Sequence, residues 1–270
     1  MFLRGTQCKR FCLGVIACAI LSAHAFAHDF WIEPQTFRPQ VGAKVPLHLH
    51  VGSDFKGDAA LFNPEQFNRY VYFGPSGERP VAGQLGDDPA GTIAVDKPGL
   101  YAVIYDSRKF DVSFNDFNKF QDYLKDEGLE KHMPFAKARA GNGGKITEVY
   151  SRCAKALLAA PQGEAAPAGH DFHCVLELVA ETNPYRDSEL KLRLLFKGAP
   201  VADVLVVAFT KAEPANKIRI RTDKEGRVTF RLPKGGVWLV KAVHMTAAAR
   251  FIRGDWESYW ASLTFEAPTR

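Results

Sequence analysis

Seven short apolar stretches in the second half of the chain constrain its fold more than any other feature. In 189–196, leucine or phenylalanine fills every second position from Leu190 to Phe196, and charged side chains fill most of the positions between. This alternation is typical of a strand with one buried face. Seven such strands, separated by glycine and proline turns, predict an immunoglobulin-like or related Greek-key sandwich. They lie at 174–180, 189–196, 202–209, 218–222, 227–232, 237–244 and 258–265.

The first half of the chain also has β periodicity. Residues 44–52 alternate, with apolar side chains on one face and His48 and His50 on the other. Pro98 followed by Gly99 marks a turn between two strands, because proline presets φ and glycine accepts a positive φ. We expect a strand and turn at 30–39 and further strands at 69–73, 79–82, 91–95, 100–105 and 146–158.

One helical segment interrupts this β pattern. Phe117, Phe120 and Leu124 follow one another at helical spacing, which predicts a helix that buries an aromatic stripe. Ser113 is the expected N-cap and Gly128 the expected end of this helix. A second helical piece is expected at 129–138.

Together these patterns predict a mainly β protein of two β-sandwich domains, the C-terminal one immunoglobulin-like, with a helical insertion in the first. The N-terminal domain is expected at 28–158 and the C-terminal domain at 171–270. The segment between them, 159–170, is rich in alanine, proline and glycine, as linkers often are.

Residues 1–27 have the composition of a signal peptide. Three basic residues and no acidic ones precede an apolar run, 11–27, which ends in the small-x-small pattern Ala25-Phe26-Ala27. The run is too short for a convincing transmembrane span. We therefore expect cleavage after Ala27, a periplasmic protein, and no transmembrane segment in the mature chain.

Two other processing sites remain open. Cleavage after Ala25 would place His28 third, an amino terminus that can bind Cu(II) or Ni(II) through its amine, backbone amides and imidazole. A lipobox-like sequence ends at Cys18, but the apolar core before it, 11–17, is short.

The charge balance argues against a nucleic-acid binder. Of 35 basic residues, three lie in the signal peptide, which leaves 32 against 30 acidic residues. Nucleic-acid binders usually carry a strong basic excess or a basic run, and the chain has neither.

The mature chain contains two cysteines, Cys153 and Cys174. An even pair in an oxidising compartment predicts one disulfide. Two free thiols or joint metal ligation are the alternatives, and both are less compatible with an oxidising periplasm.

Histidines suggest a metal site. A mature chain that begins at His28 would present an amine and an imidazole on one residue, which together can chelate a metal. His48 and His50 project from the same strand face, about 6–7 Å apart at the backbone, as in many metal sites. His244 ends a predicted strand and is a further candidate ligand. For each of the last three, a histidine without metal is the plain alternative.

No catalytic motif is present in the mature chain: we find no nucleophile elbow, zinc-protease helix, dinucleotide fingerprint or CxxC pair. We therefore do not expect an enzyme.

Four segments resemble one family, the exported bacterial domains of unknown function that are linked to nickel and cobalt uptake. The segments are AHDFWIEP at 27–34, YSRCAKAL at 150–157, WLVKAVHM at 238–245 and DWESYWASLTF at 255–265. The resemblance implies a periplasmic accessory, similar to a nickel transport component, that binds Ni(II) or Co(II), with Cu(II) also possible, and serves a membrane metal transporter. It also implies a role for a histidine near a free amino terminus, which His28 matches.

Two other functions stay open at this point. One is an envelope interaction or scaffold module of immunoglobulin-like form, in which the histidines are incidental. The other is a copper protein with an amino-terminal histidine site.

Overall fold

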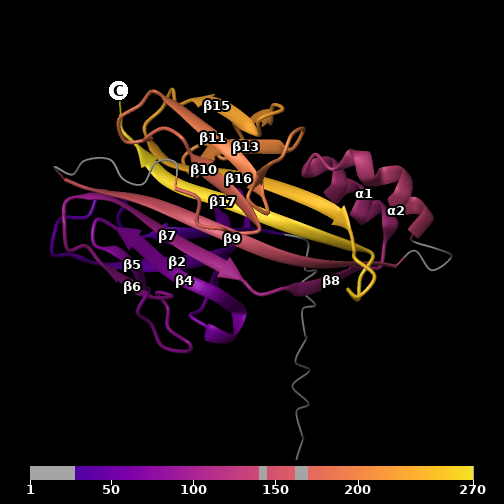
Figure 1. Cartoon of the computed structure of the whole chain (residues 1–270), viewed down its shortest axis with the longest axis horizontal. Coiled ribbons are helices and arrows are strands. Elements are labelled where there is room, and N and C mark those ends of the chain that lie inside the picture. Colours follow the sequence, from indigo (N-terminus) through magenta and orange to yellow (C-terminus); the bar gives the residue numbers. More distant parts are fainter. Residues whose placement is uncertain (1–27, 140–144, 162–169, 270) are drawn as a thin grey trace, which may run out of the picture.

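The computed structural model describes residues 28–139, 145–161 and 170–269, and it is built around one large β-sheet (Figure 1). Within the described residues this sheet has nine strands. They are β4 (Phe67–Gly74), β5 (Gly77–Pro80), β7 (Gly99–Ser107), β8 (Phe110–Phe114), β9 (Ile146–Ala160), β13 (Leu205–Thr210), β14 (Ile218–Arg221), β16 (Gly236–Ala247) and β17 (Trp256–Ala267). Their order is β14-β13-β16-β17-β9-β7-β4-β5, with β8 also paired to β9.

Two smaller sheets, each of four strands in the described part of the chain, cover the large one. The first contains β1 (Asp29–Pro34), β2 (Lys44–Ser53), β3 (Lys56–Ala60) and β6 (Thr92–Ala94). The second contains β10 (Leu176–Ala180), β11 (Glu189–Phe196), β12 (Ala199–Pro200) and β15 (Arg227–Arg231).

The two small sheets lie on opposite faces of the large sheet. In β7, Ala102 and Ile104 pack into the core beneath the second small sheet. Tyr101, Val103 and Tyr105, which alternate with them, pack into the core beneath the first. Because neighbouring side chains of a strand point to opposite faces, the molecule has three layers with β7 buried on both sides.

A parallel pairing of β9 with β17 joins the two halves of the large sheet. It runs from Glu148 beside Trp256 to Ala156 beside Thr264. On one side of it, β4, β5, β7 and β9 form a sandwich with the first small sheet. On the other, β14-β13-β16-β17 faces β10-β11-β15, the strand grouping of an immunoglobulin-like domain. The predicted fold class is confirmed. The pairing of β9 with β17, which joins the two halves into one sheet, was not predicted.

The segment predicted as a linker lies for the most part outside the described residues, since 162–169 are not described. Residues 159 and 160 belong to the end of β9. The seven strands predicted in the second half all form, with ends that differ by a few residues.

The helical insertion forms as predicted, apart from its start. It comprises α1 (Phe117–Asp126), the 3-10 turn η2 (Glu130–His132) and α2 (Met133–Arg139); a further 3-10 turn, η1, spans Pro64–Gln66. The prediction that Ser113 caps this helix was wrong, because Ser113 lies in β8 and pairs with Thr147. Asp116 caps α1 instead, its carboxylate accepting the N–H of Asn118 at 2.9 Å. Gly128 follows the helix with a φ of 70°.

The helices pack on the same face of the large sheet as β1. Phe120 and Leu124 of α1 share a buried cluster with Met245 and Trp260. Tyr259 and Ala261, which flank Trp260, face the opposite core. No helix in the described ranges has the length and hydropathy needed to cross a membrane.

The predicted disulfide is confirmed. Cys153 in β9 is bonded to Cys174, just before β10, and both are buried. Beside it, the buried Glu177 carboxylate accepts the N–H groups of Phe172 and Cys174 and a 2.7 Å hydrogen bond from the Lys155 ammonium. The disulfide therefore attaches the second small sheet to β9, the central strand of the large sheet.

Removing this disulfide should destabilise the protein without changing its fold. For the double variant Cys153→Ala/Cys174→Ala, we expect the free energy of unfolding to fall by about 3 kcal/mol, since the bond closes a loop with a separation of 21 residues. Denaturant unfolding measures this. An unchanged denaturant midpoint would show that the disulfide is absent or does not contribute to stability.

Candidate functional site

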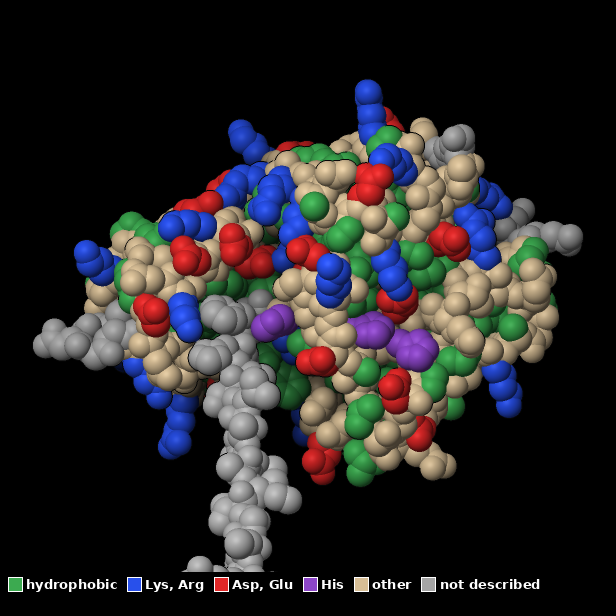
Figure 2. Space-filling model, turned by 180° about the vertical axis from the view of Figure 1, so that it is seen from behind, with side chains coloured by type: hydrophobic (Ala, Val, Ile, Leu, Met, Phe, Trp, Pro, Cys, Tyr) green, Lys and Arg blue, Asp and Glu red, His purple; other side chains and the backbone are tan. Residues whose placement is uncertain are grey.

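The pairing of β1 with β2 builds the most distinctive polar surface of the first small sheet. His50 lies opposite Trp31, and His48 lies opposite Glu33. Leu47 and Leu49, which alternate with the histidines, are buried in the core. Both imidazoles therefore project from the outer face of β2, as the sequence predicted. Figure 2 shows histidine side chains exposed on one side of the molecule.

The two imidazoles belong to a stack of rings. The centres of the His48 and His50 rings are 6.2 Å apart, with 21° between their planes. His50 in turn stacks on Trp31, with centres 5.1 Å apart and 25° between planes. Trp31 is 1% exposed and touches Phe55 edge-on. A rigid aromatic base thus supports His50, while His48 lies farther into solvent.

Each imidazole has a carboxylate beside it. His48 Nδ1 lies 3.4 Å from Asp88 Oδ1, and His50 Nε2 lies 3.9 Å from Glu33 Oε2. Glu33 also pairs with the ammonium of Lys211. No local sequence pattern links Asp88 to His48. Only the folding of the 81–92 region back onto β2, through Ala82 and Thr92, brings Asp88 to His48.

Partial burial changes the pKa of His50. Desolvation lowers its pKa below the ordinary 6.5, and the nearby Glu33 carboxylate opposes part of this shift. The His50 imidazole is therefore neutral at neutral pH, the state that can bind a metal.

The geometry of the pair is close to what one shared ion needs. A metal–nitrogen bond of about 2.0–2.1 Å puts each ring centre roughly 3.2 Å from the ion, so two ligands can have centres at most about 6.4 Å apart. The observed 6.2 Å lies just inside that limit, which applies when the two nitrogens stand on opposite sides of the ion. A tetrahedral angle between the ligands corresponds to ring centres about 5.2 Å apart, so the rings must then move closer as well as turn. As they stand, no group of three or more His, Cys, Asp or Glu side chains within the described ranges is arranged to hold a metal.

The other two predicted ligands lie elsewhere. His28 precedes β1, three positions before Trp31 and thus about 10 Å along an extended chain from the partner of His50. Its carbonyl oxygen accepts a hydrogen bond from Arg152 at 3.3 Å. Of the four predicted residues, the structure brings together only His48 and His50.

His244 lies across the large sheet from β2. It pairs with Tyr259 in the β16–β17 ladder, and its ring centre is 4.5 Å from that of Phe196 in β11. Burial lowers the pKa of His244 to about 4. Since β11 and β2 cover opposite faces, the thickness of the sheet separates His244 from the histidine pair.

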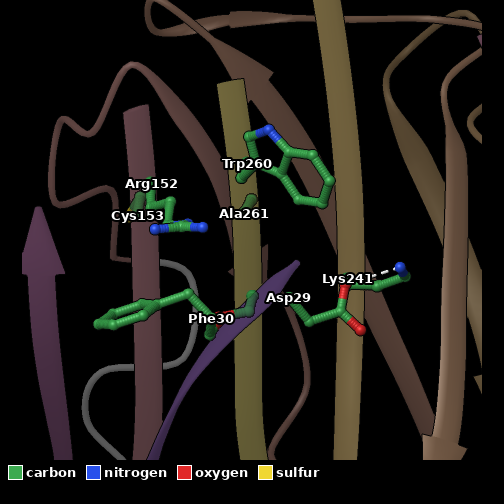
Figure 3. Close-up of a pocket in the computed structure, with 8 residues that line it drawn as sticks. Asp29, Phe30, Arg152, Cys153, Lys241, Trp260 and Ala261 are labelled. Carbon is green, nitrogen blue, oxygen red and sulfur yellow. Dashed lines mark hydrogen bonds and ion pairs between the residues drawn. The ribbon is translucent and has the colours of Figure 1, made fainter. Parts of the chain in front are cut away.

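A buried ionic network lies where β1 meets β16 and the end of α1. Figure 3 shows three of its side chains, Asp29, Arg152 and Lys241. The Lys241 ammonium donates to Asp29 Oδ1 at 2.7 Å and to Glu127 Oε1 at 2.8 Å. Burial alone would lower the pKa of Lys241, but the two carboxylates raise it above its ordinary value. The buried Arg152 guanidinium lines the same small cavity as Asp29. Two carboxylates and two cations balance, so the network attaches β1 and α1 to the large sheet.

Another buried carboxylate, Glu148, lies under α1. Its Oε1 accepts hydrogen bonds from the hydroxyls of Tyr123, at 3.2 Å, and Ser258. Its Oε2 is buried and has no hydrogen-bond partner among the described residues. Burial raises the pKa of Glu148 to about 7.

Comparison with known protein families identifies the family of this chain. The model of a family described as "Domain of unknown function (DUF4198)" matches residues 25–246. The chain belongs to this family. The family resemblance expected from the sequence is confirmed at this level, and the link to nickel and cobalt is not part of the match. A search of curated proteins found no match.

Among solved structures, the D0-D1 domain of intimin is similar at 10% sequence identity. The alignment covers 88% of this chain and 97% of that one, with a TM-score of 0.19.

The Glu148 environment predicts an unusual pH dependence. The folded-state pKa of about 7 lies above the ordinary 4.5, so the stability linked to this group is present below pH 4.5 and is lost as the pH rises through 7. Glu148→Gln keeps the acceptor at Oε1 and cannot ionise. We expect the variant to gain roughly 2 kcal/mol relative to wild type between pH 5 and pH 8, measured by denaturant unfolding.

The matched control is Glu177→Gln, at a carboxylate that is equally buried but paired with Lys155. This variant should be less stable than wild type at both pH values, because it leaves a buried ammonium without its counter-charge. If both variants show the same pH trend, the explanation for Glu148 is wrong.

Proposed function

We propose that this protein is an exported accessory that binds a divalent transition metal in the periplasm and passes it to a membrane metal transporter. Ni(II) and Co(II) are the first candidates and Cu(II) the next. The observation that carries the proposal is the His48–His50 pair on the outer face of β2.

Three properties of the pair support metal capture. Its ring spacing of 6.2 Å lies within the reach of one shared ion. A carboxylate stands beside each imidazole, at 3.4 Å from His48 and 3.9 Å from His50, and such partners orient ligating histidines and add negative charge. The lowered pKa of His50 also reduces competition from protons.

The donor set suits late transition metals. Imidazole nitrogens bind nickel, cobalt, copper and zinc, whereas magnesium and calcium prefer oxygen ligands. Two protein nitrogens leave other coordination positions to water or to small ligands. A site with few protein ligands on an open strand favours release, which suits a carrier that hands its metal to another protein.

His28 and His244 enter the proposal differently. An amino-terminal chelate at His28 would be a separate site that forms only after cleavage between residues 27 and 28. His244 does not belong to the proposed β2 site, because it lies on the other side of the large sheet from β2.

Calorimetric titration with nickel, cobalt and copper tests the site. We expect the double variant His48→Ala/His50→Ala to weaken binding at least tenfold, roughly what losing one or two ligands or their partners costs. Binding should also weaken as the pH falls below the range where imidazoles are neutral. Quenching of Trp31 fluorescence, absent in Trp31→Phe, would report an ion at His50, since the rings are stacked.

Two controls separate the alternatives. His173→Ala changes a histidine whose side chain is 84% exposed and far along the chain from β2, and it should leave binding unchanged. His28→Ala tests the amino-terminal chelate. Binding that survives the double variant and disappears in His28→Ala would reject the β2 site, and no binding by any form would reject the function.

A further inference from the structure

The loop between β16 and β17 presents the most exposed large apolar side chain of the described residues. Phe251 is 86% exposed, whereas the strands on either side of the loop are largely buried. An isolated apolar residue on a surface is ordinary. Phe251 stands out because of how the loop holds it and what flanks it.

The loop is held by hydrogen bonds on both sides of its tip. The N–H of Ala248 donates to the Asp255 carbonyl at 3.1 Å, and the N–H of Ile252 donates to the Ala249 carbonyl at 2.9 Å. Asp255 is anchored to the start of β9, its carboxylate accepting the N–H and the hydroxyl of Thr147 at 2.8 Å each. Phe251 thus sits in a closed turn that points it away from the core.

Two unpaired arginines flank the aromatic ring in sequence. Arg250 and Arg253 are exposed, and neither has a polar or charged partner in the part of the chain that the structure describes. Elsewhere, the arginines whose side chains are described do have such partners. Examples are Arg38, Arg69, Arg79, Arg193, Arg221, Arg227 and Arg231, each with a carboxylate.

We propose that the 248–255 loop docks the protein onto an anionic phospholipid surface. In this arrangement the Phe251 ring enters the boundary between headgroups and acyl chains, and the Arg250 and Arg253 guanidinium groups bind lipid phosphates. Aromatic side chains favour that boundary. Each cation near an anionic surface adds attraction, and guanidinium binds phosphate with two parallel hydrogen bonds.

The shape of the feature favours a lipid over a protein partner. A stable protein interface needs roughly 800 Å² from each partner, with a central apolar patch. A single exposed ring on a turn offers far less area, but it suffices to enter a fluid interface beside two cations.

The helical insertion supplies a second anchor at the same end of the molecule. His132, the last residue of η2 and directly before α2, packs edge-on against Trp256, the first residue after the loop, with ring centres 5.2 Å apart. α2 exposes Phe135, at 64%, and the neighbouring Lys137 is also exposed. In Figure 1, α2 and the β16–β17 turn lie at the same end of the large sheet.

Vesicle co-sedimentation tests the docking. The exported, processed protein is mixed, in the presence of a chelator, with vesicles of phosphatidylcholine alone or of equal phosphatidylglycerol and phosphatidylcholine. We expect binding to the anionic vesicles, weaker in high salt. Arg250→Gln/Arg253→Gln should reduce it roughly thirtyfold, the factor for two cations near the surface. Phe251→Ala should reduce it at least fivefold.

Matched controls isolate the loop. Leu85→Ala removes another exposed apolar side chain, 74% exposed, and Lys224→Gln/Arg231→Gln removes two other exposed cations. Neither should change vesicle binding. All forms share one background, so lipid binding by any other segment cancels, and thermal unfolding checks that each variant folds.

Two results would overturn the proposal. One is a wild-type protein that does not sediment with anionic vesicles at low salt. The other is sedimentation that the loop variants leave unchanged. Because the chelator removes metals, neither result depends on whether the β2 histidines bind them.

Discussion

The parallel pairing of β9 with β17 is the interaction on which the rest of the molecule depends. It makes one sheet of two sandwiches and leaves both faces of the central strands covered. Two cationic side chains of β9 have partners inside the protein, and such partners matter because unpaired buried charges are costly. Lys155 pairs with Glu177, and Arg152 binds the His28 carbonyl beside Asp29. Each of these bonds attaches another element to the sheet.

The same sheet positions the histidine pair. β1 pairs with β2 along one edge. Toward the large sheet, the hydroxyls of Ser262 and Thr264 in β17 donate to the carbonyls of Phe30 and Ile32 at 2.6 Å each. These bonds satisfy backbone groups of β1 that would otherwise be buried without partners. The face of β2 that carries the histidines is thus fixed through β1 to the core.

Local patterns in the sequence were enough for most of the strands. Alternation such as that from Leu190 to Phe196 depends only on neighbours along the chain, and the buried face follows directly. The same rule placed His48 and His50 on one face. The compartment argument for cysteines likewise predicted the bond between Cys153 and Cys174.

Features that depend on distant segments could not be found this way. The pairing of Ser258 with Tyr150 joins residues about a hundred positions apart, and no local pattern marks it. Asp88 reaches His48 only through the fold. His244 lies in phase with buried residues of its strand, but the sequence does not say which sheet covers that face. The Ser113 cap failed because strand pairing overrode a local capping preference.

We propose that one ion binds between His48 and His50. Crystals grown with nickel, measured at the nickel absorption edge, test it most directly. We expect an anomalous peak within about 2.0–2.1 Å of one nitrogen from each imidazole, a typical metal–nitrogen distance. A peak at His28 or His244 with none over β2, or no protein-bound nickel at all, would contradict it.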